Sequence, residues 1–165
     1  MITGNEMADM GKAIMKQVMK ELVKSASDGG SVNQACKDAI TKKGVYTYVY
    51  GKANAPTRYI RRYDAGGIAD DDNLLTTTTS SGNTVIVDVE DRTPAGDGGM
   101  FNPPPDPVFY LSDILAAGAN GPKWIDPDHP GERPYMDESL DDGCMGGGEI
   151  DKALNALMSK IQINV

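Results

Sequence analysis

The sequence predicts an α+β domain in which an N-terminal helical hairpin, a small antiparallel β-sheet with long loops, and a C-terminal helix packed on the sheet share one core. Apolar residues recur at helical spacing near both ends of the chain, and Thr- and Val-rich runs flank a turn in the middle. Proline-rich stretches separate these parts. A length of 165 residues suits one domain, 1–165, with a single modest core.

An amphipathic helix is expected over Asp9–Lys24, and a second helix is expected from Ser31. The triplet Asp28-Gly29-Gly30 should end the first helix, and Ser31 is the candidate N-cap of the second. Because the apolar side chains of both segments recur at helical spacing, the pair is expected to pack as a helical hairpin. The apolar stripe of the first helix comprises Met10, Ile14, Met15, Val18, Met19, Leu22 and Val23, and that of the second comprises Val32, Ala35, Cys36, Ala39 and Ile40.

Val45–Tyr50 alternates β-branched and aromatic residues, a pattern that fits either the end of the second helix or a short strand. Two later runs, Leu74–Thr79 and Thr84–Glu90, are predicted to pair as an antiparallel hairpin around the turn Ser80–Asn83. Side chains alternate between the two faces of a strand. One face of the second run should therefore carry Val85, Val87 and Val89, and the other Ile86, Asp88 and Glu90.

The second half of the chain is predicted to be mostly loop until its last helix. Prolines remove backbone donors throughout positions 93–107, so this stretch is expected to be a Gly/Pro-rich loop insertion. A short helix is expected over Phe109–Ala117, and another loop should run to Pro134. Gly146-Gly147-Gly148 is expected to act as a hinge before a closing amphipathic helix over Glu149–Ile163.

The charge balance bears on the partners of the protein. The formal net charge is −8 and the isoelectric point is about 4.6. A protein that binds DNA tightly needs a surplus of clustered Lys and Arg, which this chain lacks. An acidic surface suits a protein that DNA slides past without binding. No stretch approaches the length of a membrane span. Cys36 and Cys144 lie far apart in the sequence and are expected to be free thiols.

Two acidic clusters are candidates for metal or catalytic chemistry. Asp70-Asp71-Asp72-Asn73 opens like a calcium loop, but the Gly and the closing Glu of that motif do not fall in place, which favours a solvated acidic turn. A second cluster surrounds the single histidine, but prolines and a glycine interrupt it, which favours an exposed polar loop. Its members are Asp126, Asp128, His129 and Glu132. Nucleophile elbows and phosphate-binding loops are absent from the sequence, so neither an enzyme nor a cofactor is expected.

One cluster of the sequence combines basic and aromatic side chains. It consists of Arg58, Tyr59, Arg61, Arg62 and Tyr63. Stacking and phosphate pairing would allow such a cluster to contact nucleic acid. Given the net charge of −8, salt bridges within the domain or between subunits are the favoured interpretation.

Several short segments follow one another in a distinctive order. Pro56-Thr57-Arg58-Tyr59-Ile60-Arg61-Arg62-Tyr63, with Gly66-Gly67 behind it, follows the N-terminal helices, and Arg133-Pro134-Tyr135-Met136 precedes the last helix. Between them lie Asn83-Thr84-Val85-Ile86-Val87 and Leu111-Ser112-Asp113-Ile114-Leu115. This arrangement spans most of the chain and resembles the head–tail joining, or tail-completion, family of long-tailed bacteriophages. The insertion at about 93–107 and the triple glycine depart from the family pattern.

The resemblance implies a small virion protein of the neck, made in the host cytoplasm and then carried in the particle. Its subunits are expected to form a homo-oligomeric ring, a hexamer or a dodecamer, that completes and docks the tail. Genomic DNA would pass through the ring without specific binding. The expected neighbours are portal-side adaptor, neck and tail proteins, with no membrane and no cofactor.

The contacts between ring subunits are expected to use aromatic and arginine side chains. Such residues are enriched at the centres of protein interfaces, and guanidinium groups pair well with carboxylates. The candidate interface residues are Tyr59, Arg61, Arg62, Arg133 and Tyr135.

Three alternatives remain open on the sequence alone. The chain could belong to another layer of the neck, as a tail terminator or a head-closure ring subunit. It could be a metal-dependent enzyme built on the cluster around His129. It could also be a host-directed binding module, such as an inhibitor, which would act as a monomer on a host partner.

Overall fold

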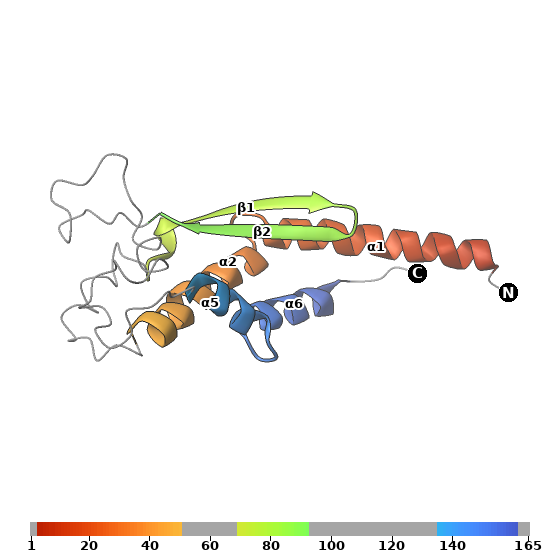
Figure 1. Cartoon of the computed structure of the whole chain (residues 1–165). Helices are drawn as coiled ribbons and strands as arrows, with labels where there is room; N and C mark the ends of the chain where they lie inside the picture. Colours follow the sequence, from red (N-terminus) through yellow and green to blue (C-terminus); the bar gives the residue numbers. More distant parts are fainter. Residues whose placement is uncertain (1–2, 51–68, 93–134, 162–165) are drawn as a thin grey trace.

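The structure, a computed structural model, describes residues 3–50, 69–92 and 135–161 (Figure 1). Several expected features lie outside these residues. They are the basic and aromatic cluster at 58–63, the loop insertion at 93–107, the helix Phe109–Ala117 and the loop that contains His129.

The first helix, α1 (Gly4–Ala26), confirms the expected amphipathic helix and begins earlier than Asp9. Its start is set by a capping box, in which the Glu6 amide donates to Thr3 Oγ1 over 3.2 Å and the Thr3 amide donates to the Glu6 carboxylate over 2.8 Å. The helix ends where Ser27 turns to an extended conformation. The box satisfies amides that no helical carbonyl can reach, so the helix includes a first turn that has little apolar periodicity.

A glycine turn joins α1 to α2 (Ser31–Asp38), as expected. Gly29 has a φ of 84°, which favours glycine, and a Cβ on Gly30 would lie 2.1 Å from the Ser25 carbonyl oxygen. The cap differs from the prediction, because Gly30 is the N-cap and Ser31 is the first helical residue. Gly30 has no side chain to accept a hydrogen bond, and the Val32 amide donates instead to Ser25 Oγ over 3.1 Å.

The helical hairpin continues without a break into η1 (Ala39–Tyr50), a π-helix. The segment Val45–Tyr50 is therefore helical, which decides between the two conformations that the sequence allowed. In a π-helix the backbone bonds join residues five apart. Ile40 and Val45 are separated by that interval, and both are fully buried at 0% exposure.

The predicted β-hairpin is confirmed. β1 (Leu74–Ser81) and β2 (Thr84–Asp91) pair antiparallel, with Thr76 opposite Val89 and Ser81 opposite Thr84. Gly82 supplies the positive φ, 59°, of the two-residue turn. The three valines of β2 are half-buried on one face, as the alternation predicted, and the opposite face is exposed, with Ile86 at 50%.

Helix α5 (Tyr135–Cys144) occupies a segment over which no element was predicted. Asp137 and Glu138 lie in its first turn, where carboxylates interact favourably with the helix dipole. The glycines expected to act as a hinge form a turn in which the Gly148 amide donates to the Met145 carbonyl over 2.8 Å. The expected closing helix, α6 (Glu149–Lys160), follows directly.

The elements meet around α2. The hairpin lies on one side of α2, and α5 and α6 lie on the other (Figure 1). A cluster of small side chains fills the centre, and partly buried residues of β2, α5 and α6 pack against it. The cluster comprises Ala35, Cys36, Ala39 and Ile150, and its neighbours are Val87, Val89, Leu140, Ala153 and Leu154. The predicted α+β class is therefore confirmed, but α6 packs mainly on α2 and α5, with α2 between it and the hairpin, so the expectation that it packs on the sheet is corrected.

Gly44 of η1 allows α5 to approach closely, because a Cβ there would lie 1.7 Å from Ser139 Oγ and 2.4 Å from Ser139 Cβ. We predict that Gly44→Ala lowers the free energy of unfolding by about 1–3 kcal/mol through overpacking. The matched control is Gly11→Ala on α1, where a Cβ meets nothing within 4 Å. That control should raise the free energy by about 0.5–1 kcal/mol. Urea unfolding of both variants checks this, and an unchanged midpoint for Gly44→Ala would contradict the close packing of η1 on α5.

Candidate functional site

The structure describes one of the five predicted interface residues, Tyr135. Its side chain is 1% exposed, and its hydroxyl donates to Asp91 Oδ2 over 3.0 Å. Asp91 is itself 2% exposed, so this contact fastens α5 to the end of β2 inside the chain. The expectation that Tyr135 faces a neighbouring subunit is corrected accordingly. Tyr59, Arg61, Arg62 and Arg133 lie outside the described residues.

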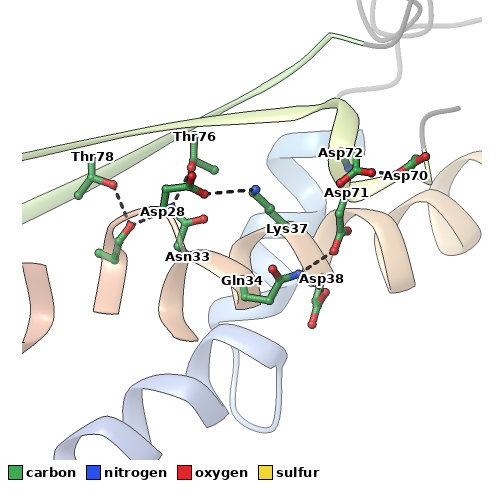
Figure 2. Close-up of polar contacts among 11 residues, drawn as sticks. Asp28, Asn33, Gln34, Lys37, Asp38, Asp70, Asp71, Asp72, Thr76 and Thr78 are labelled. Atoms are coloured by element: carbon green, nitrogen blue, oxygen red, sulfur yellow. Dashed lines mark hydrogen bonds and ion pairs between the residues drawn. The ribbon is translucent and has the colours of Figure 1, made fainter. Parts of the chain in front are cut away.

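The acidic run at Asp70–Asn73 forms a turn with a structural role. Asp70 caps the short 3₁₀ helix η2 (Asp71–Asn73), and Asp71 accepts a hydrogen bond from Gln34 Nε2 over 2.6 Å (Figure 2). Asp71 also accepts a hydrogen bond from Thr41 Oγ1. These bonds tie the start of the hairpin to α2 and η1. Across the part of the chain that the structure describes, no group of three or more His, Cys, Asp or Glu side chains is arranged to hold a metal ion. The cluster around His129 lies outside that part.

A buried polar contact, here called the Asn33 joint, connects α1, α2 and β1. It consists of Asn33, the Ala26 carbonyl, Thr76 and Thr78 (Figure 2). The Asn33 amide nitrogen donates to the Ala26 carbonyl over 2.9 Å and to Thr76 Oγ1 over 2.8 Å. Thr78 Oγ1 donates to the same carbonyl over 2.8 Å. Asn33 is 1% exposed and its bond to Ala26 is buried, while the bonds of Thr76 and Thr78 are part-buried. Together the three bonds fix the end of α1 against the hairpin.

Charged contacts fasten η1 to the two C-terminal helices. Lys43 Nζ lies 2.7 Å from the Glu149 carboxylate, and this hydrogen bond lowers the pKa of Glu149. The Tyr48 hydroxyl donates to the Asp142 carboxylate, which raises the Tyr48 pKa to about 12. Both pairs are largely exposed to solvent, so their role is to position the helices more than to stabilise the fold.

Two hollows are present on the described surface. A cavity of about 110 Å³ lies between η1 and α5, next to Gly44 and Ser139. A groove of about 490 Å³ lies between the α1–α2 turn and α6, with Ala153, Ala156 and Leu157 along its wall. In the lining of the cavity, Ser139 Oγ donates to the Tyr135 carbonyl and Lys43 pairs with Glu149, so these polar groups are engaged in contacts between helices.

The outward side of α1, which carries Met7 and Met15, is exposed along most of the helix. Only Ser25 and Ala26 are buried among its 23 residues. Met7 is 64% exposed and Met15 is 43% exposed, although both are apolar. Of the predicted apolar stripe, Met15 is exposed and the other six residues are half-buried, so the fold covers the stripe only in part. None of the helices in the described ranges has the length and apolar content needed to cross a membrane.

Comparison of the chain with protein-family models, with curated proteins and with solved structures finds no match. What the chain does must then be inferred from its residues and from the surface that its fold presents. In the described ranges that surface includes the outward side of α1, the acidic side of α5 and the outer face of the hairpin.

The two cysteines differ in their surroundings. Burial raises the pKa of the Cys36 thiol to about 11, with a smaller contribution from Cys144, and Cys144 itself is exposed. The thiolate is the reactive form, so a pKa two units higher lowers its population about 100-fold at neutral pH. We predict that a disulfide reagent modifies Cys144 at least about 100-fold faster than Cys36 in the folded protein.

Absorbance of the released thiol measures both rates. Cys144→Ser should remove the fast phase and leave the slow one, and unfolding in urea should make both thiols react at similar rates. Two equally fast thiols in the native protein would contradict the burial of Cys36.

Proposed function

We propose that the chain is a structural subunit of a tailed-bacteriophage particle that forms a ring in the head–tail connector. In this role the protein completes and docks the tail and leaves a channel for DNA. Its chemistry is recognition between surfaces, with no bond made or cut. A tail terminator or a head-closure ring subunit is the alternative layer within the same assembly.

The observation that carries the proposal is the uncovered side of α1. Two of the 23 residues of α1 are buried, and its apolar stripe is only half-buried, so a neighbouring surface that covered the stripe would bury further apolar area. A subunit whose neighbours cover this side explains its composition. The order of sequence segments that resembles the neck family supports the same role.

Ring formation also suits the shape of the described surface. In a closed ring each contact joins one face of a subunit to a different face of the next. A contact of standard size buries on the order of 800 Å² on each partner. The outward side of α1 and the far side of the molecule around α5 offer two such different faces (Figure 1).

Mass spectrometry of purified particles from the phage that encodes the chain tests the proposal. We expect a low and fixed copy number, about six or twelve per particle for a closed cyclic ring. Labelling of a tagged chain in negative-stain images should place it at the junction of head and tail. Cross-links to portal-side proteins or to tail proteins would show which layer of the neck the chain occupies. Absence from mature particles, or spread along the capsid or tail tube, would overturn the proposal.

A further inference from the structure

A stripe of lysines runs along the exposed side of α1. Lys12, Lys16, Lys20 and Lys24 recur every four residues, and all are exposed. At 1.5 Å per residue the stripe extends over about 18 Å. None of these ammonium groups forms an ion pair with another described residue of the chain.

Apolar side chains border this stripe. Residues three apart are neighbours on a helix surface, so Met15 lies beside Lys12 and Met19 lies beside Lys16. Met15 is 43% exposed and Met19 is half-buried. The stripe thus borders accessible methionine, a residue enriched at protein interfaces, and its lysines favour a partner surface of opposite charge.

The complementary charge lies on α5 of the same chain. Asp137, Glu138 and Asp141 are exposed, and neither Lys nor Arg occurs in this helix. Asp142 adds a further carboxylate, which accepts the Tyr48 hydroxyl. Met145, 64% exposed, directly follows the helix. The acidic face, like the lysine stripe, therefore combines charged side chains with an exposed methionine.

The two surfaces do not meet within one molecule. Helix α1 runs from its junction with α2 away from α5, and its N-terminal end lies beyond the tip of the hairpin (Figure 1). A contact between the lysine stripe and the acidic face therefore needs two copies of the chain. Because the faces are different, the contact is head-to-tail, and repetition of one such contact builds a ring or a filament.

We propose that the lysine stripe of α1 docks on the acidic face of α5 of a second copy of this chain. This inference rests on the proposed ring-forming function and names the surfaces that would form the ring contact. Self-association of this kind weakens as salt rises, because screening limits exposed charges to about 8 Å at physiological ionic strength. A nucleic acid is the competing occupant of a lysine stripe, and the net charge of −8 disfavours it.

Charge reversal on each surface tests the contact, with sedimentation velocity at about 0.05 M and at about 0.5 M salt as the measurement. The first variant carries Lys12→Glu, Lys16→Glu and Lys20→Glu. The second carries Asp137→Lys, Glu138→Lys and Asp141→Lys. Each variant alone should self-associate at least about tenfold more weakly than the parent chain. Circular dichroism confirms that both are folded.

Mixing the two variants supplies the decisive result. The reversed α1 of one variant faces the reversed α5 of the other, and their unaltered surfaces also match, so the mixture should regain association in alternating copies. A control with the same charge change as the second variant on exposed residues elsewhere, Asp72→Lys, Asp88→Lys and Glu90→Lys, should self-associate like the parent chain.

Three outcomes would overturn the inference. They are a parent chain that stays monomeric at low salt, variants that associate like the parent, and a mixture that does not recover. Retention of duplex DNA that is lost with the lysine changes, while self-association is unaltered, would assign the stripe to nucleic acid instead. The particle composition measured for the proposed function is independent, so either proposal can fail while the other stands.

Discussion

The carboxamide of Asn33 sets the arrangement of the elements around it. The central apolar cluster consists mostly of small side chains, Ala35, Cys36 and Ala39, which interlock weakly and would tolerate shifted packing. A buried amide is less tolerant, because leaving its donor or acceptor without a partner costs about 1–3 kcal/mol. Asn33 at 1% exposure finds its partners only when the end of α1 and strand β1 lie where they do. Polar complementarity therefore selects the packing that the apolar cluster alone would leave loose.

The position fixed by this joint also decides which surfaces remain outside. The end of α1 is held at Ala26, and the helix then extends past the hairpin (Figure 1). The lysine stripe, Met7 and Met15 are exposed along it. On the other side of α2, the bond from Tyr135 to Asp91 and the close approach at Gly44 hold α5 with its carboxylates in solvent. A fold that separates basic and acidic faces in this way is suited to repeated contact between copies, as the proposed ring requires.

Local patterns explain which parts could be predicted from the sequence. The repeat from Met10 to Leu22 and the turn at Gly82 are short-range signals, and α1 and the hairpin were predicted from them. Helix α5 was missed because Asp and Gly143 lower its helix propensity, while long-range contacts to Asp91 and Gly44 hold it. Long-range contacts also limited the prediction of the candidate site. The spacing of the lysines is visible in the sequence, but the acidic face forms only when α5 has folded. The burial of Tyr135 likewise depends on contacts with residues distant in the chain.

The coupling between Asn33 and Thr76 tests most directly whether the buried joint governs the fold. In a double-mutant cycle, Asn33→Ala and Thr76→Val are made singly and together, and the free energy of unfolding is measured for each. The structure predicts that both single changes destabilise the protein and that the pair interacts by about 0.5–1.5 kcal/mol. Single effects that add within about 0.3 kcal/mol would mean that the 2.8 Å contact has no energetic role, and the account of the joint would be contradicted.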